Sequence, residues 1–133
     1  MSNLTTVQEI YAAFGRGDVP AILDRLADLV EWEYGAGATD IPWLQTRRGR
    51  AGAAEFFSSL SALEIEKFVP KRFLEGPDLV VVLLDLEAKV KATGKRILDE
   101  DYVHIWYFDE KNRVTRFRHR ADTQQHLAAY RGA

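Results

Sequence analysis

The sequence predicts an α+β fold in which three N-terminal helices cover one face of an antiparallel sheet. Three observations favour this class. Apolar residues in the first half recur with the period of a helix, whereas residues beyond position 64 alternate as in strands. Turn-forming residues separate the later strands by only a few positions, as in a meander. The length of 133 residues suits one core, so we expect a single domain over 1–133.

The first two helices are marked by capping residues. Thr6 and Glu9 have the spacing of a capping box, and an amphipathic stretch follows them and ends at Gly15. Asp18 is placed to cap a second helix that has Pro20 in its first turn.

The next segment predicts a short strand, a loop and the third helix. Residues 30–34 alternate strictly, which places Trp32 and Tyr34 on the inner face of a strand. A glycine-rich, irregular connection is expected over 35–50 and a helix over about 51–63.

The second half of the chain predicts an antiparallel meander. Pro70 lies within the first of its strands, so this strand should occupy an edge or contain a bulge. Gly94 indicates a tight hairpin turn, and a short helix is expected over 124–130. The predicted strands are 64–75, 79–92, 96–108 and 113–123.

Composition excludes several classes of protein. A formal net charge of -2 argues against a nucleic-acid partner. With no cysteine, the chain can form neither a disulfide nor a thiolate site. No apolar run is long enough to span a bilayer, and no signal peptide is recognisable. We therefore expect no membrane partner, no cofactor and a cytoplasmic location.

His119 is predicted to point into the interior. In its strand, successive side chains face opposite sides of the sheet. Phe117 and His119 share one side, and the other carries Arg116, Arg118 and Arg120. Because three arginines cannot be buried without partners, the arginine side should face outward.

The predicted register brings a carboxylate to two imidazoles. A two-residue turn in the first hairpin would pair Asp85 with His104 and Glu87 with Tyr102. The next hairpin would then set Tyr102 beside His119. Asp85, His104 and His119 would converge on the inner face, whereas a one-residue slip in either turn would send one strand's set outward.

Several stretches resemble a known family. They include VEWEY, RRGRAGAAEFF and RVTRFRHRADT, and with the order of elements they cover nearly the whole chain. The chain resembles the SnoaL-like branch of the nuclear transport factor 2-like superfamily, which includes polyketide cyclases, ketosteroid isomerases and limonene epoxide hydrolases. The resemblance implies a cystatin-like cone, in which a strongly curved antiparallel sheet wraps around three N-terminal helices and leaves a central pocket. It also implies homodimers that form through the outer face of the sheet.

The resemblance is incomplete at the catalytic positions. His104 lies in HIWYFDEKNRV, which is similar to the isomerase strand whose protonated acid binds the substrate oxygen. His119 falls where epoxide hydrolases have a general-base aspartate and where cyclases are expected to keep an acid/base carboxylate. Tyr34 falls near the isomerases' proton-shuttling aspartate, and Tyr11 is one position from their oxyanion-hole tyrosine. Neither catalytic set is intact, so neither activity can be transferred.

Two classes of function remain open, with a purely structural role as a third. In the first, His119, His104 and Asp85 are catalytic: an Asp–His pair acts as general base on a small apolar or carbonyl-bearing compound, as in isomerisation or cyclisation. Tyr34 and Tyr102 would then donate hydrogen bonds to the enolate oxygen. In the second, the same cavity binds a lipophilic ligand without turnover. The predicted ligand-binding residues are Trp32, Tyr34, Trp43, Phe57, Tyr102, Trp106 and Phe117.

Four further expectations concern the interior, a metal site, the outer face and a group of arginines. In a structural dimerisation domain, large aromatic side chains would fill the interior and leave no cavity. His104, His119 and Asp85 are possible metal ligands by type, but no HxH or HExxH spacing supports a metal site, and none is expected. On the outer face, Val103, Ile105 and Tyr107 form an apolar stripe that a homodimer would cover. The arginines at 47, 48 and 50 are either a solvated connection or a site for an anionic substrate.

Overall fold

The computed structural model describes residues 2–34 and 40–132. Its helices are α1 (Asn3–Gly15), α2 (Val19–Leu23), α3 (Gly49–Ser59), the short 3-10 helix η1 (Leu60–Ala62) and α4 (Thr123–Arg131). Its strands are β1 (Leu26–Glu33), β2 (Arg47–Arg48), β3 (Leu63–Glu75), β4 (Leu79–Val90), β5 (Arg96–Phe108) and β6 (Val114–Arg120).

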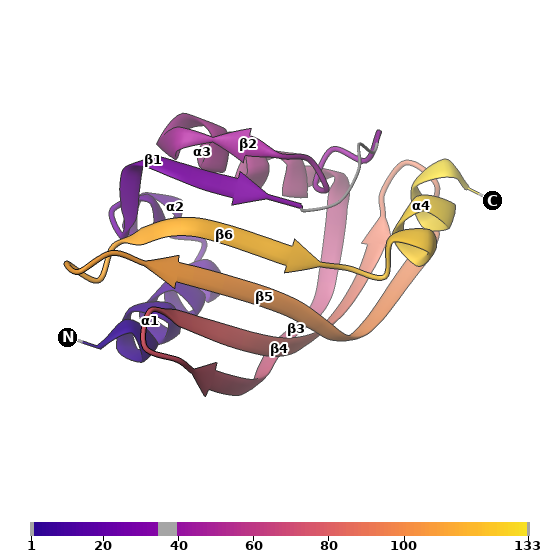
Figure 1. Cartoon of the computed structure of the whole chain (residues 1–133). Coiled ribbons are helices and arrows are strands. Elements are labelled where there is room, and N and C mark those ends of the chain that lie inside the picture. The colour runs from indigo at the N-terminus through magenta and orange to yellow at the C-terminus, as the bar shows by residue number, and fades with distance from the viewer. Residues whose placement is uncertain (1, 35–39, 133) are drawn as a thin grey trace.

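The strands form one six-stranded sheet in the order β2-β1-β6-β5-β4-β3. α1, α2 and α3 lie on the same side of the sheet, and α4 lies at one end beside the β4–β5 hairpin (Figure 1). The predicted α+β class and the antiparallel meander of β3 to β6 are confirmed. β3 is an edge strand with a register shift between Pro70 and Arg72, as the proline suggested.

One of the two predicted helix caps differs in the structure. Ser2 caps α1, because its side chain accepts a hydrogen bond from the backbone N–H of Thr5 at 3.0 Å. The predicted cap, Thr6, is buried inside the helix, so that prediction is wrong. Asp18 caps α2 as predicted. Of the irregular connection predicted over 35–50, residues 35–39 lie outside the described part of the chain.

β1 pairs in parallel with β6, an arrangement that the sequence did not indicate. This pairing places carboxylates of β1 beside the arginine side of β6. Arg116 forms ion pairs with Glu31 at 2.7 Å and with Glu33 at 2.8 Å. Arg116 therefore finds its carboxylates on the neighbouring strand of the same chain.

The loop of the β4–β5 hairpin is longer than predicted. The backbone N–H of Val90 donates to the carbonyl of Lys95, and the N–H of Gly94 donates to the carbonyl of Val90, both at 2.8 Å. The loop closed by the Val90–Lys95 pair therefore contains the four residues 91–94, where two were predicted. As a result, Glu87 pairs with Leu98 and not with Tyr102.

Asp85 lies on the outer face of the sheet, contrary to the prediction. Val82, and not Asp85, pairs with His104. The Asp85 carboxylate accepts a hydrogen bond from the backbone N–H of Asp101 at 3.1 Å and pairs with Lys71 at 2.9 Å. Asp101 has a φ of 58°, a left-handed conformation that aspartate tolerates better than most residues. This irregularity at Asp101 separates two registers of the β4–β5 ladder.

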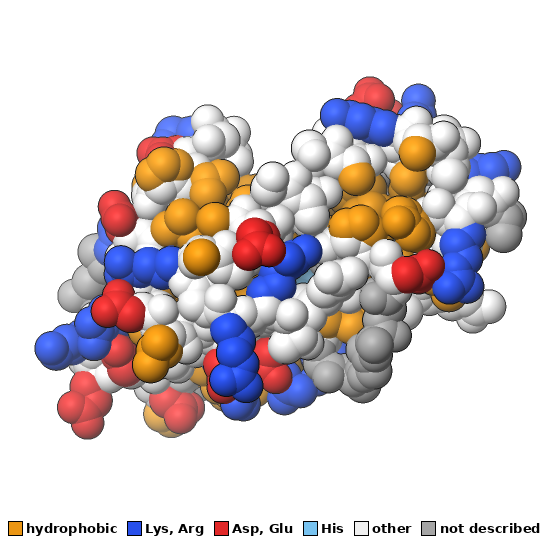
Figure 2. Space-filling model, turned by 90° about the horizontal axis from the view of Figure 1, so that it is seen from above, with side chains coloured by type: hydrophobic (Ala, Val, Ile, Leu, Met, Phe, Trp, Pro, Cys, Tyr) orange, Lys and Arg blue, Asp and Glu red, His pale blue; other side chains and the backbone are white. Residues whose placement is uncertain are grey.

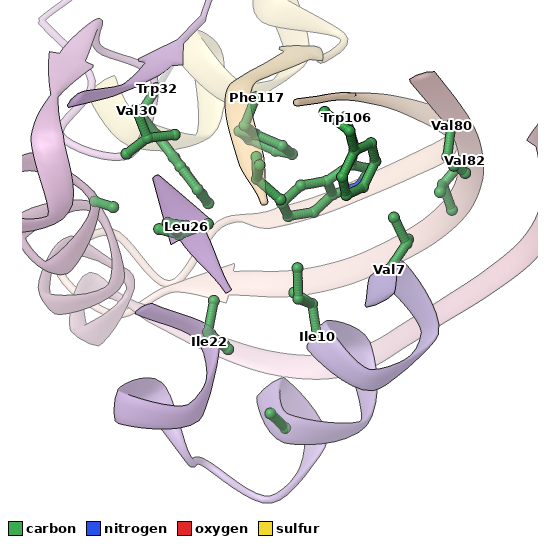
Figure 3. Close-up of a cluster of buried hydrophobic side chains, with 14 residues drawn as sticks. Val7, Ile10, Ile22, Leu26, Val30, Trp32, Val80, Val82, Trp106 and Phe117 are labelled. Carbon is green, nitrogen blue, oxygen red and sulfur yellow. The ribbon is translucent and has the colours of Figure 1, made fainter. Parts of the chain in front are cut away.

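The core lies between the helices and the inner face of the sheet. Side chains of α1 and α2, such as Ile10 and Ile22, point toward those of the sheet in Figure 3. Phe117 packs against two tryptophans, with ring centroids 4.3 Å from Trp32 and 4.4 Å from Trp106. These aromatic contacts join β1, β6 and β5 at the centre of the molecule.

α4 covers the part of β5 that extends beyond β6. The Gln125 side chain bonds to both backbone groups of Leu98: its carbonyl accepts from the N–H, and its NH₂ donates to the carbonyl at 3.0 Å. At the next residue of β5, the buried Asp99 carboxylate accepts a hydrogen bond from the backbone N–H of Asp122 at 3.0 Å. These bonds take the place of strand pairing at this edge.

The surface carries hydrophobic side chains outside the core. Figure 2 shows them gathered in two groups on one face, with charged side chains around and between them. No helix in the described part of the chain combines the length and the apolar character that crossing a membrane requires.

Candidate functional site

A cavity of about 60 Å³ lies between the helices and the inner face of the sheet. Its wall is almost entirely apolar or aromatic, and no Lys, Arg, Asp or Glu lines it. Its polar lining residues are Tyr11, Tyr102, His104 and His126, together with the indole groups of the tryptophans. A water molecule needs roughly 10–15 Å³ of such space, and pockets that bind drug-sized ligands have volumes of about 300–1,000 Å³. The interior is therefore neither wide open nor completely filled.

Most of the predicted aromatic residues reach this cavity. The six that line it are Trp32, Trp43, Phe57, Tyr102, Trp106 and Phe117. Tyr34 is buried but does not line it. Of the predicted catalytic residues, only His104 lines the cavity. His119 is buried without lining it, and Asp85 is on the other face of the sheet. A role of these residues in binding a ligand stays a prediction.

An open groove of about 350 Å³ adjoins the cavity between α1 and β3. Gly15 and Pro70 line only the groove, whereas four residues line both spaces: Tyr11, Phe14, Ile65 and Phe68. The rings of Phe14 and Phe68 lie 4.9 Å apart between centroids. The cavity and the groove thus have a common wall of large apolar side chains.

Hydrogen bonds within the chain orient His104. The Trp106 indole N–H donates to the hydroxyl of Tyr11 at 3.0 Å, and this hydroxyl lies 2.6 Å from Nδ1 of His104. Since the indole can only donate, Nδ1 is the one acceptor among the described residues for the proton of the Tyr11 hydroxyl. We assign the neutral tautomer of His104 with the proton on Nε2 from this network.

His104 is a neutral hydrogen-bond donor at the cavity wall. Burial, reinforced by the neighbouring His119, holds the pKa of His104 well below its usual value. Burial also raises the pKa of the Tyr11 hydroxyl, with the Trp106 hydrogen bond acting in the opposite direction. Nε2 of His104 makes no hydrogen bond to any residue in the described ranges, and 8% of the residue's surface is exposed. In this tautomer, the free Nε2–H can donate to a ligand.

His119 is closed off from the cavity. It is 0% exposed, and its Nδ1 lies 2.6 Å from the hydroxyl of Tyr102. Its Nε2 has no hydrogen-bond partner among the described residues. Burial is the main reason that the pKa of His119 is lowered to about 3, with His126 and Arg120 adding to the effect. A sealed, neutral imidazole in aromatic surroundings is poorly placed to exchange protons with a ligand.

The structure gives His126 partners that the sequence did not indicate. The Trp43 indole N–H donates to Nδ1 of His126 at 3.0 Å, and Nε2 lies 2.8 Å from the carboxylate of Asp99. An indole can only donate, so Nδ1 is the acceptor and Nε2 carries the proton toward Asp99. Asp99 is only 4% exposed. Both nitrogens of His126 are therefore committed within the chain, although its ring lines the cavity.

Sequence reasoning gave no role in the site to three residues of this interior: Tyr11, Asp99 and His126. The apolar stripe of the first helix does place Tyr11 inward with Val7 and Ile10, but nothing in the sequence assigned its hydroxyl a partner. Asp99 could not be placed, because the irregularity at Asp101 changes the alternation of β5. His126 required the fold, since its partners are 27 and 83 residues away.

The remaining polar predictions do not add groups to the cavity. Arg47 donates to the carbonyl of Pro42 at 2.9 Å, and Arg50 donates to that of Leu26 at 2.8 Å, which supports a structural role for both. In residues 2–34 and 40–132, no group of three His, Cys, Asp or Glu side chains could hold a metal ion.

Comparisons with known proteins point to one family. The family model described as the SnoaL-like domain matches residues 7–117. No curated protein matches the chain.

Solved structures share the fold over nearly the full length of the chain. An NTF2-like protein of unknown function from Burkholderia pseudomallei K96243 is 28% identical, with a TM-score of 0.84 and 98% of each chain covered. An NTF2-like protein from Burkholderia xenovorans LB400 is also 28% identical, with a TM-score of 0.84 and 96% and 95% covered. TerC, co-crystallised with polyporic acid, is 27% identical, with a TM-score of 0.82 and 97% and 98% covered.

Buried neutral histidines make stability depend on pH. In the unfolded chain, His104 and His119 bind protons near pH 6.5, whereas in the folded state their lowered pKa values keep them neutral. The unfolded state therefore binds more protons, and the free energy of unfolding should fall as pH drops below about 6.5. Each histidine contributes up to about 1.4 kcal/mol per pH unit in this window. We expect His119→Phe to reduce the slope between pH 6.5 and 5, as measured by urea denaturation. An equal slope in the variant and the parent would contradict the assignment of a depressed pKa to His119.

Proposed function

The chain belongs to the SnoaL-like domain family, and from this premise we propose that it binds a small apolar compound that carries a carbonyl or similar acceptor oxygen. One observation carries the proposal: at a largely apolar cavity wall without charged side chains, the Nε2–H of His104 has no partner among the described residues. A polar group in such a place is best satisfied by a ligand acceptor. TerC, a 27% identical relative crystallised with a small molecule, supports ligand binding in this fold.

The hydrogen bonds among Trp106, Tyr11 and His104 fix the orientation of the imidazole as a donor. Tyr11 holds Nδ1, so the imidazole cannot turn its unprotonated nitrogen toward the ligand without breaking the bonds among Trp106, Tyr11 and His104. Because the ring is neutral, binding an oxygen does not require a buried charge. The aromatic side chains around it would contact the apolar part of the compound.

A second candidate function is catalysis of isomerisation or cyclisation. The neutral donor favours it, because an N–H aimed at a carbonyl oxygen also stabilises the negative charge of an enolate. Asp85 is on the outer face and can no longer be proposed as part of the base. Under the assigned tautomers, the cavity lining offers neither a carboxylate nor an imidazole nitrogen free to take a proton. We therefore rank binding ahead of turnover.

Replacing His104 tests the proposed hydrogen bond to the ligand. We expect His104→Phe to weaken binding of 2-hexanone roughly 3- to 10-fold, the effect of one lost hydrogen bond. The matched variant His119→Phe should leave the affinity unchanged, because His119 does not line the cavity. Titrations followed through the indole N–H signals of Trp32, Trp43 and Trp106 would report binding, since all three line the cavity. Equal affinities of both variants, or no binding to the parent, would overturn the proposal.

Proton exchange of the ligand separates binding from turnover. If the chain stabilises an enolate, the protons next to the carbonyl of 2-hexanone should exchange with deuterated water faster in its presence, and His104→Phe should abolish the increase. Proton NMR measures this exchange directly. Exchange at the rate found without protein would leave binding as the function and exclude this enolisation.

We also propose that two copies pair through the outer face of the sheet. Val103, Ile105 and Tyr107 are partly exposed there, and Leu74 of β3 is 56% exposed. Exposed apolar groups of this kind are typical of interfaces. We expect sedimentation velocity to give a dimer for the parent and a monomer for Ile105→Lys. Ala12→Lys, on the exposed side of α1, should remain dimeric, and a monomeric parent would refute the pairing.

A further inference from the structure

The cavity alone cannot hold the compound that the proposed function requires. Its volume of about 60 Å³ is equivalent to a few water molecules, and a ring or a long chain does not fit in it. His104 lies at the wall of this small space and not in the groove. A ligand that bonds to Nε2 must therefore place only a small end in the cavity and the rest of its body elsewhere.

The groove between α1 and β3 offers the adjoining space. Its volume of about 350 Å³ is several times that of the cavity. Tyr11, Phe14, Ile65 and Phe68 line both spaces, so the groove lies directly beyond the side chains that form this part of the cavity wall. Phe14, Ile65 and Phe68 are each partly exposed, which leaves apolar surface for a ligand to cover.

The lining also selects against charge. Neither the cavity nor the groove is lined by Lys, Arg, Asp or Glu. A carboxylate or an ammonium group would lose water there without gaining an ion pair, which is unfavourable. The neutral His104 offers a hydrogen bond but no compensating charge.

From these observations we infer that the site takes an extended, uncharged ligand, with its acceptor oxygen on His104 in the cavity and its apolar body along the groove past Phe14 and Phe68. This inference rests on the proposed function and adds the shape and charge of the ligand. Straight-chain methyl ketones are a suitable probe series, because the carbonyl stays at one end while the tail lengthens.

The experiment compares 2-butanone, 2-hexanone, 2-octanone and 2-decanone by the indole N–H titration. Affinity should rise roughly two- to fourfold per added methylene while the tail buries itself in the groove, close to the usual gain per buried methylene. Octanoate should bind at least 10-fold more weakly than 2-octanone, because it brings a charge that the lining cannot pair.

Gly15 provides a sharp test of the groove. It lines the groove and not the cavity, and a Cβ built at this position meets no atom within 4 Å. Gly15→Phe should therefore fold normally and remove most of the gain between 2-butanone and 2-octanone. Ala12→Phe adds the same ring at an exposed position of α1 outside the groove and should keep the gain.

The outcomes separate this inference from the proposed function. If ketones bind in a His104-dependent way but affinity does not rise with length, or Gly15→Phe keeps the full gain, the extended placement is wrong and the proposed function stands. If octanoate binds as tightly as 2-octanone, the preference for uncharged ligands is wrong. If no ketone binds, both the inference and the proposed function fall.

Discussion

The interior depends on hydrogen bonds between aromatic side chains and buried imidazoles, and all three histidines of the chain share this contact. In each, Nδ1 lies within hydrogen-bond distance of an aromatic polar group: Tyr11 for His104, Tyr102 for His119 and Trp43 for His126. A buried polar group left unpaired would cost free energy, so each aromatic donor stabilises both the histidine and the element that carries it. The three differ in the surroundings of Nε2. In His126 it lies at the Asp99 carboxylate, and in His119 it has no hydrogen-bond partner among the described residues. In His104 it lies at the cavity wall and is available to a ligand.

Sequence reasoning succeeded where alternation is local and failed where register is set at a distance. The inward positions of His119, Tyr102 and His104 follow from alternation within their own strands, and the structure confirms them. Asp85 was misplaced because a two-residue turn was assumed, although charged and apolar residues alternate through 84–90 and already indicate an outward Asp85. The left-handed residue at Asp101 has no sequence signature of its own, so the inward Asp99 could not be foreseen.

The same aromatic side chains serve as core and as cavity wall. Trp32, Trp106 and Phe117 are almost fully buried and also line the cavity, so its volume is what the packing of large rings leaves over. Interiors are close-packed, and a change in any of these rings would alter stability and space together. The shape of the site is therefore tied to the stability of the fold, whereas the groove, which Gly15 and Pro70 help to line, can vary more freely.

Gln125 shows that a half-buried surface position can be as restricted as one in the core. Its amide satisfies a donor and an acceptor of the β5 backbone at once, as a neighbouring peptide unit would. Glutamate would bring only acceptors when ionised and lysine only donors, and asparagine is one methylene shorter. The protection of this strand edge from unwanted pairing with other chains thus depends in part on one side-chain amide, at a place where burial alone would suggest that almost any polar residue is tolerated.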